Sequence, residues 1–175
     1  MPFPEGSSLI RLTADYQVKP FNCGDADLND FLLNDSKSYL SKLLAVTYIL
    51  ENETETIAFF SLFNDKITID DVDSKSKWKW FKKATGKSFS SHPAMKIGRL
   101  GVSNNFKGRG IGTITLDYIK EMFITNNRTG CRYITVDAYA ASLSFYEKNG
   151  FEYLTNRDIG SDTRLMYFDL IVLCS

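Results

Sequence analysis

The segment from Arg99 to Thr113, Arg-Leu-Gly-Val-Ser-Asn-Asn-Phe-Lys-Gly-Arg-Gly-Ile-Gly-Thr, constrains the fold of this chain more than any other. An apolar run ending at Val102 predicts a strand that leads through a glycine-rich turn into an amphipathic helix. Glycines at 108, 110 and 112 let the backbone approach a ligand closely. The free N–H groups and positive dipole end of that helix would face the turn, an arrangement that binds anions such as pyrophosphate.

The composition predicts one compact domain, residues 1–175, because 43% of the residues are hydrophobic and 14% are aromatic. No apolar run approaches the ~20 residues that a membrane span needs. The first residues lack the basic and apolar regions of a signal peptide, so we expect a cytoplasmic protein with no membrane partner. Equal numbers of basic and acidic residues, 21 each, argue against a dedicated nucleic-acid binder.

The cysteines and the histidine of the chain do not form the spacings of a metal site. Cys23, Cys131 and Cys174 share no CxxC spacing, which predicts free thiols. His92 is the only histidine, so sites rich in histidine are excluded and no bound metal is expected. Because His92 precedes Pro93, we expect it in an exposed loop.

Hydrophobic periodicity and turn signals predict strands and helices that alternate along the chain. Strands are expected at 7–13, 46–50, 56–63, 95–102, 131–138, 151–154 and 164–170. Helices are expected at 25–44, 77–84, 110–126 and 142–148, the first capped by Asp25 or Asp27. The buried stripes are expected to be Leu28, Phe31, Leu32, Tyr39 and Leu43 on the first helix, and Ile111, Ile114, Tyr118 and Met122 on the third. This order indicates a mixed sheet in an α/β sandwich.

Two segments of the chain resemble nucleotide-binding motifs, but neither motif is complete. Thr113 and Thr115 stand where the two registers of a dinucleotide fingerprint require the third glycine, although Asp137 lies about where a ribose-binding acid would. Gly86-Lys87-Ser88 looks like the end of a P-loop, but Phe81 stands where that motif begins with glycine. A Rossmann-like nucleotide binder and a glycine turn without a ligand remain as alternatives.

From Arg99 onward the chain resembles the Gcn5-related N-acetyltransferase (GNAT) family. Lys107-Gly-Arg-Gly-Ile-Gly112 is similar to the family's phosphate loop, Gln/Arg-x-x-Gly-x-Gly/Ala, with lysine in the first position. Ser144-Phe-Tyr-Glu-Lys-Asn-Gly-Phe151 is similar to a second family segment, A-x-x-F-Y-x-x-x-G-F. The resemblance implies the acyl-CoA N-acyltransferase fold: a mixed central sheet of about six to seven strands, helices on both faces, and a splay at the coenzyme A site.

Two further segments narrow the resemblance. Residues 21–32 and 92–102 resemble a branch of the family that includes tRNA-acetylating toxins. The resemblance implies an N-acetyltransferase that moves an acetyl group from acetyl-CoA to a primary amine by direct attack. The acceptor stays open between a small-molecule amine and a peptide or protein amine, with aminoacyl-tRNA less favoured, and a homodimer stays open as well.

The resemblance also implies a set of site residues. Backbone amides in the glycine turn would take the pyrophosphate, with charge-assisted contacts from Lys107 and Arg109. The backbone of Leu100 and Val102 would pair with the pantetheine arm, with the Leu100 amide as the oxyanion donor. Tyr146 would be the general acid that protonates the leaving thiolate. The expected coenzyme A contacts are Leu100, Val102, Lys107, Gly108, Arg109, Gly110, Gly112 and Thr113.

The chain departs from the family's pattern at two places. Residues 137–142 lack the asparagine that often contacts coenzyme A, and residues 94–102 lack the acid that often serves as general base. The base is therefore not identified, but an α-amine with a pKa near ~8 is partly neutral already and needs only water. A module that binds acyl-CoA without catalysis is a second alternative.

Residues 75–83, Lys-Ser-Lys-Trp-Lys-Trp-Phe-Lys-Lys, place five lysines around three aromatic residues. Interleaved basic and aromatic side chains can hold single-stranded nucleic acid. The favoured interpretation is a solvated helix face with its aromatic residues, Trp78, Trp80 and Phe81, buried.

Overall fold

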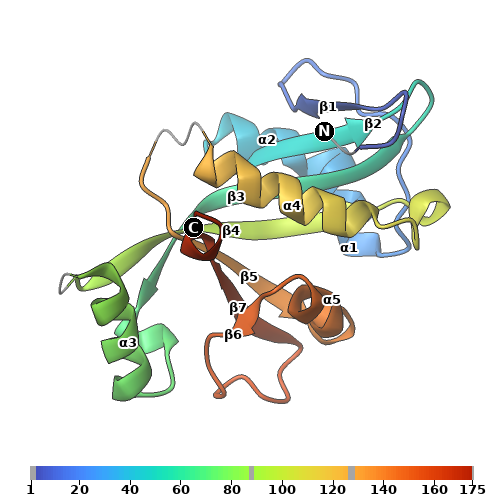
Figure 1. Ribbon diagram of the computed structural model, residues 1–175. Coiled ribbons are helices and arrows are strands. Elements are labelled where there is room, and N and C mark those ends of the chain that lie inside the picture. Colours follow the sequence, from blue (N-terminus) through green and yellow to red (C-terminus); the bar gives the residue numbers. More distant parts are fainter. Residues whose placement is uncertain (1–2, 87–88, 126–128, 175) are drawn as a thin grey trace. The chain divides into compact units, whose positions relative to one another are not determined.

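The computed structural model describes residues 3–86, 89–125 and 129–174, and Figure 1 shows the course of the chain. The strands are β1 (Ser8–Arg11), β2 (Val46–Glu51), β3 (Thr56–Thr68), β4 (Ser91–Val102), β5 (Tyr133–Tyr139), β6 (Glu152–Tyr153) and β7 (Thr163–Asp169). The α-helices are α1 (Ala26–Asp30), α2 (Ser36–Ser41), α3 (Lys75–Thr85), α4 (Ile111–Ile124) and α5 (Leu143–Lys148). Short helical turns are η1 (Phe31–Asp35), η2 (Ile69–Asp71), η3 (Asn104–Phe106), η4 (Ala140–Ser142) and η5 (Leu170–Leu173).

The strands follow one another in the order β1-β2-β3-β4-β5-β7-β6. The pairs β1–β2, β2–β3, β5–β7 and β6–β7 are antiparallel. The chain divides into two compact units, Met1–Phe63 with Ile97–Ile119 and Asn64–Lys96 with Lys120–Ser175. The two long strands β3 and β4 contribute residues to both units, and a single domain over 1–175 stays a prediction.

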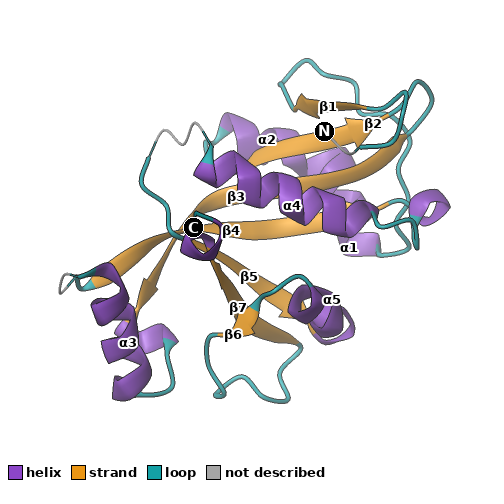
Figure 2. Ribbon diagram, in the orientation of Figure 1, coloured by secondary structure: helices purple, strands orange, loops and turns teal. Residues whose placement is uncertain are grey.

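The sheet in the first unit buries side chains on both faces, because successive residues of a strand point to opposite sides. Ile49 pairs with Phe59, and both belong to an apolar cluster with Phe31 and Leu32. Leu50 pairs with Ala58, and both belong to a second cluster with Ile111. Figure 2 shows α4 over one face of these strands and the α1–α2 segment over the other, as the family resemblance implies.

The predicted helix 25–44 is interrupted by a π-helical turn. Asp25 caps its start as expected, since the carboxylate accepts the Leu28 N–H at 3.0 Å. The wider turn at Phe31–Asp35 shifts the register of the residues that follow, so the later part of the predicted stripe leaves the core. Tyr39 is 39% exposed and Leu43 is 92% exposed, which corrects the prediction that they are buried.

Helix α4 forms where it is predicted, but its buried stripe is displaced. Ile111 is buried as expected, whereas the buried apolar residues further along are Leu116 and Ile119. Ile114, Tyr118 and Met122, which the periodicity assigns to the core, are only half-buried. A helix packed over a sheet buries a wide arc, and spacing alone does not decide which edge of that arc faces inward.

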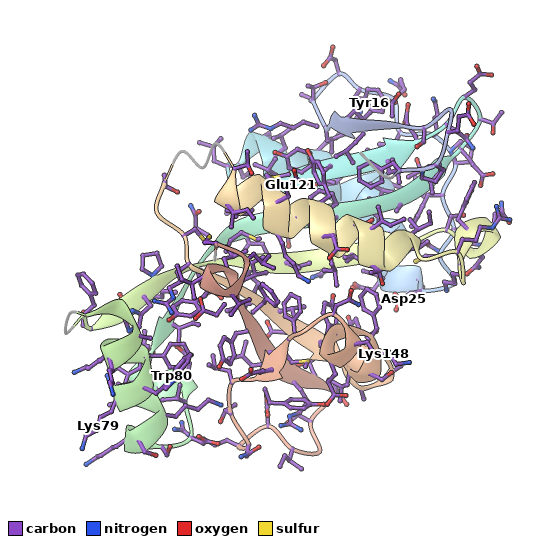
Figure 3. All side chains as sticks on the ribbon, viewed as in Figure 1. Tyr16, Asp25, Lys79, Trp80, Glu121 and Lys148 are labelled. Carbon is purple, nitrogen blue, oxygen red and sulfur yellow. The ribbon has the colours of Figure 1, made fainter. Side chains whose placement is uncertain are left out.

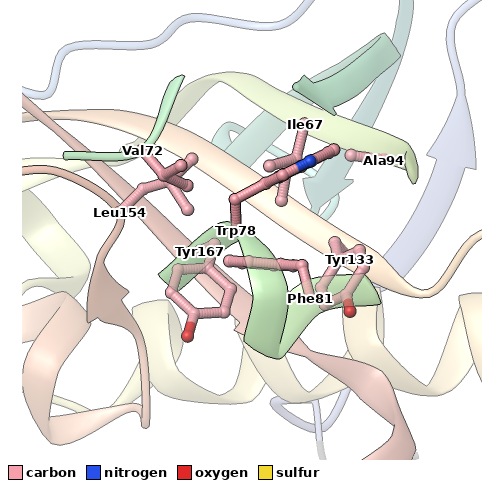
Figure 4. Close-up of a cluster of buried hydrophobic side chains, with 8 residues drawn as sticks. All are labelled: Ile67, Val72, Trp78, Phe81, Ala94, Tyr133, Leu154 and Tyr167. Atoms are coloured by element: carbon pink, nitrogen blue, oxygen red, sulfur yellow. The ribbon is translucent and has the colours of Figure 1, made fainter. Parts of the chain in front are cut away.

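The core cluster of the second unit is half aromatic and lies between α3 and the sheet. Trp78 and Phe81 of α3 pack with Tyr133 of β5 and Tyr167 of β7 (Figure 4). Phe81 lies 5.2 Å from Tyr133 and 5.4 Å from Tyr167, measured between ring centroids. Such ring pairs add to the free energy of burial and fix the helix on the sheet.

Candidate functional site

The glycine turn of the first unit joins β4 to α4 and has the backbone that its glycines predict. Gly108 and Gly110 both have φ of +76°, a left-handed conformation that other residues adopt only with strain. A Cβ at either position would meet no atom within 4 Å, so the turn presents an open backbone surface. Both glycines and the intervening Arg109 are exposed.

The first turn of α4 has backbone N–H groups that can bind an anion. The Ile114 N–H bonds to the Gly110 carbonyl at 3.0 Å, so the amides of Ile111, Gly112 and Thr113 precede the first turn that this bond closes. Thr113 is exposed and Gly112 is half-buried. These N–H groups, with the positive end of the helix dipole, suit a phosphate group.

An apolar cluster packs against the residues on either side of the glycine turn. Ile111 is 3% exposed and packs with Leu50 of β2 and Ile57 of β3, while Val102 and Phe106 pack against the same cluster. The guanidinium of Arg109 lies 5.2 Å from the centroid of the Phe106 ring. This cation–π contact restricts the Arg109 side chain to the vicinity of the turn.

Hydrogen bonds tie the turn to the segment before α1. Lys107 Nζ donates to the Cys23 carbonyl at 2.6 Å, and the Asn104 N–H donates to the Asn22 carbonyl at 2.9 Å. Gly24 has a φ of +82°, and its missing side chain leaves room for Asn104. A Cβ built on Gly24 would lie only 3.3 Å from the amide group of the Asn104 side chain. Lys107 thus has a structural partner that the sequence did not predict, and two of its three N–H groups remain for a phosphate.

Arg99 of β4 links the two segments that carry the branch-level resemblance. Its Nε lies 3.6 Å from the Asp27 carboxylate, and its guanidinium lies 5.2 Å from the Phe31 ring centroid. The neighbouring residues Leu100 and Val102, expected to contact the pantetheine arm, are half-buried on the same strand. Residues 21–32 therefore meet the part of 92–102 that belongs to the first unit, through Arg99.

Tyr146 lies on α5 in the second unit and is 6% exposed. Its ring packs against Phe145 at 5.1 Å and Phe151 at 5.3 Å between centroids. Burial raises the pKa of Tyr146 well above its usual value, so the phenol keeps its proton at neutral pH. The C-terminal end of α5 is fixed by Lys120, whose Nζ donates to the Asn149 carbonyl at 2.9 Å.

His92 is not in an exposed loop, which corrects the prediction from sequence. It lies within β4 and is 1% exposed, because β4 begins at Ser91 and carries Pro93 inside the strand. Its ring lies 5.1 Å from Trp78 and 6.0 Å from Tyr133, between centroids, and its Nε2 is a buried atom with no hydrogen-bond partner among the described residues. Burial, with Arg132 and Lys82 nearby, lowers the pKa of His92.

We expect the buried His92 to make the fold sensitive to mild acid. Its pKa in the folded chain is lowered, so the unfolded chain takes up the proton first as the pH falls below ~6.5, and the free energy of unfolding decreases. Urea unfolding between pH 8 and pH 5 measures this loss. The difference between wild type and His92→Gln should change over that range, and a constant difference would show that His92 does not cause the loss.

Asp137, which stands about where a ribose-binding acid would, has a different partner. Its carboxylate lies 2.8 Å from Lys96 Nζ on β4. Lys96 Nζ is also 3.8 Å from Asp65, which accepts the Thr135 hydroxyl at 2.5 Å. Together with the antiparallel strand pairs, this ion-pair network contradicts the Rossmann-like alternative, which requires a largely parallel sheet.

Comparison with known proteins decides the family. A profile described as an acetyltransferase (GNAT) domain matches residues 45–153, more than half of the chain. The chain belongs to the acetyltransferase (GNAT) domain family. The family, fold class, enzyme class and acetyl-CoA donor that the sequence predicts for this GNAT protein are confirmed at the level of the family. No curated protein sequence matches the chain significantly.

Solved structures share the GNAT fold of the chain. One described as a bacterial toxin has a TM-score of 0.80 at 17% identity, covering 96% of this chain and 93% of its own. AtaT complexed with acetyl-methionyl-tRNAfMet has a TM-score of 0.74 at 20% identity, covering 95% of this chain and 96% of its own. A mutant AtaT toxin bound to the C-terminus of the antitoxin AtaR and acetyl-CoA has a TM-score of 0.70 at 17% identity, covering 98% and 99%.

The part of the GNAT chain that the structure describes contains neither a membrane-spanning helix nor a cluster of metal ligands. No helix there is long and apolar enough to cross a membrane. Over the same residues, no group of three or more His, Cys, Asp or Glu side chains is placed to hold a metal ion. Cys23, Cys131 and Cys174 are free thiols, as their spacing predicts.

Proposed function

We propose that this chain transfers the acetyl group of acetyl-CoA to the α-amino group of an aminoacyl-tRNA. The observation that carries the donor half of the proposal is the open backbone of the glycine turn at the start of α4. Two glycines with positive φ and the amides that follow them fit a pyrophosphate, and no side chain stands in the way. Gly108, Gly110, Gly112 and Thr113 would hold the phosphates, with Lys107 and Arg109 as charged partners.

The transfer needs one bond to form and one to break. The neutral amine attacks the thioester carbonyl carbon, the carbon–sulfur bond breaks, and the acetyl group is joined to nitrogen. The amide of Leu100 would stabilise the charge that develops on the carbonyl oxygen, while Val102 would help align the pantetheine arm. The amine's proton leaves to water, and the departing sulfur takes a proton from Tyr146, which solvent then restores.

The raised pKa of Tyr146 is compatible with this role. A thiol near ~8.5 is a stronger acid than an exposed phenol near ~10, so the donation is uphill by ~1.5 pKa units in water. Burial that raises the pKa of the phenol also raises the pKa of a thiol leaving in the same environment. The mismatch therefore stays small, and the acid stays protonated until it is used.

The acceptor is inferred from three observations. The segments 21–32 and 92–102 resemble the branch that includes tRNA-acetylating toxins, and they are packed together through Arg99, Asp27 and Phe31. AtaT, which shares the fold, is solved with acetyl-methionyl-tRNAfMet. Residues 94–102 carry no acid, which favours an α-amine that deprotonates near neutral pH over a lysine side chain.

A thiol-release assay tests the proposal. Acetyl-CoA should be consumed with aminoacyl-tRNA, and acetylated α-amine should appear, while acetyl-lysine peptides should not form at a comparable rate. Thermal stability should rise with acetyl-CoA but not with ATP or NAD, following RT ln(1 + [L]/Kd). A shift with acetyl-CoA but no thiol release with any amine would instead favour a binding module without catalysis.

The pH dependence of the reaction is also fixed by the proposal. We expect kcat/KM for the acceptor to rise about tenfold per pH unit below the amine's pKa and to level near pH ~8. No falling limb should appear below pH ~10, because burial raises the pKa of Tyr146. Initial rates at saturating acetyl-CoA measure this profile, and a falling limb near pH 8 would exclude Tyr146 as the acid.

A further inference from the structure

Helix α3 presents a cationic face to solvent, and the favoured interpretation of residues 75–83 is only partly right. Trp78 and Phe81 are buried in the aromatic core, as the favoured interpretation predicts, but Trp80 is 48% exposed. Lys75, Lys79 and Lys83 are exposed as well. Figure 3 shows Lys79 and Trp80 together on α3.

The spacing of the lysines on this face destabilises the helix, because it places like charges next to one another. Lys75, Lys79 and Lys83 stand four residues apart, which places them along one side of α3, where like charges repel. Residues 75–85 contain no Asp or Glu to offset them. An anionic ligand along the same side would turn this repulsion into attraction.

The other two lysines of α3, Lys77 and Lys82, are half-buried. Lys77 Nζ donates to the Tyr153 carbonyl at 2.7 Å and lies 5.9 Å from the Tyr167 ring centroid, so it fastens α3 to the sheet. Lys82 is half-buried beside His92 and lowers its pKa. The cationic face is therefore defined as Lys75, Lys79, Trp80 and Lys83.

Trp80 is held in place while it is exposed. Its ring meets the buried Phe81 ring edge to face, at 5.1 Å between centroids and 88° between planes. Phe81 is fully buried, so the indole is supported from the core side and open on the solvent side. An exposed aromatic ring beside lysines is the arrangement on which an unpaired base stacks while its phosphates are neutralised.

We infer that the cationic face of α3 binds the phosphodiester backbone and an unpaired base of tRNA. The inference rests on the proposed function, because it names the surface that would retain the acceptor while its amine reacts. The chain as a whole has no net charge, so this local excess of lysines supplies a contact that the overall charge does not. An anionic membrane also attracts lysines, and the test below separates the two partners.

Binding of fluorescently labelled, unacylated tRNA at several salt concentrations tests the inference. Changing Lys75, Lys79 and Lys83 to glutamine should weaken binding at least ~10-fold at low salt and reduce the slope of log K against log [salt] by about 2. Trp80→Ala should weaken binding ~5-fold or more, whereas Trp80→Phe should retain most of the affinity. Circular dichroism of each variant establishes that α3 is still folded.

The matched control removes three charges from exposed positions elsewhere, Arg11→Gln with Lys42→Gln and Lys66→Gln. This control should bind tRNA as the wild type does. Equal losses in both triple variants would show a general charge effect and overturn the inference. Binding of the wild type to phosphatidylserine vesicles but not to tRNA would overturn it too.

Acetylation of methionine amide, a small α-amine, keeps this test separate from that of the proposed function. The α3 variants should acetylate methionine amide as fast as the wild type and lose rate only with aminoacyl-tRNA. If α3 variants and wild type act alike on aminoacyl-tRNA, the surface is wrong and the enzyme stands. If the wild type binds tRNA through α3 but releases no thiol with any amine, the proposed reaction is wrong and the surface stands.

Discussion

Replacing Gly110 with glutamate should abolish acetyl-CoA binding, with an affinity loss of about 10³-fold or more. A carboxylate within ~4 Å of a phosphate at the protein surface is disfavoured by ~4 kcal/mol, and it would also compete with the phosphate for Lys107 and Arg109. The change also places a Cβ at φ of +76°, which costs about 1–2 kcal/mol of stability. Calorimetric titration with acetyl-CoA and the unfolding temperature measure the two effects separately.

Two control variants isolate the charge at Gly110. Gly110→Gln has the same backbone strain and nearly the same shape, so it should lose stability equally but lose much less affinity. Gly160→Glu adds the same side chain at another exposed glycine, with φ of +85° and open space around its Cβ, and should leave acetyl-CoA affinity unchanged. Wild-type affinity in Gly110→Glu would mean that the coenzyme lies elsewhere.

Replacing Tyr146 with phenylalanine should reduce kcat about 10²-fold while acetyl-CoA affinity changes by less than ~2-fold. Only the hydroxyl is removed, and the contacts of the ring with Phe145 and Phe151 are kept, so the fold should be retained. Steady-state rates at saturating acetyl-CoA, with affinity from a separate titration, give the split between catalysis and binding.

A second buried tyrosine provides the control for Tyr146. The Tyr133 hydroxyl is buried without a hydrogen-bond partner among the described residues, so Tyr133→Phe removes an equivalent group away from the proposed chemistry. It should leave kcat unchanged. If Tyr146→Phe retains kcat as well, Tyr146 is a packing residue and the leaving thiolate obtains its proton from water.

The parts of the fold that the sequence predicts are those with local signals. Asp25 caps its helix because a carboxylate three residues before the bonded N–H is sufficient, and Gly108 and Gly110 adopt the left-handed backbone that only glycine accepts freely. The order of strands and helices follows from periodicity in the same way. These interactions involve residues within one turn of each other, so spacing reveals them.

The features that sequence analysis missed depend on partners far along the chain. Lys107 donates a hydrogen bond to the carbonyl of Cys23, 84 residues earlier, and no spacing rule indicates that pair. Pro93 after His92 predicts a position at the surface, but Trp78 and Tyr133 from other elements bury the His92 ring. Leu43 left the predicted stripe because a π-helical turn, invisible in the hydrophobic pattern, shifted its register.

Both tryptophans of this chain lie two residues apart on α3, Trp78 at 5% exposure and Trp80 at 48%. The intrinsic fluorescence of the protein therefore originates from a single helix, with one emitter in the aromatic core and one in water. Collisional quenchers reach the second emitter and not the first. The emission of Trp78 therefore reports on the packing of the core, and the emission of Trp80 reports on the solvent-facing surface of α3. Neither measurement needs an added dye.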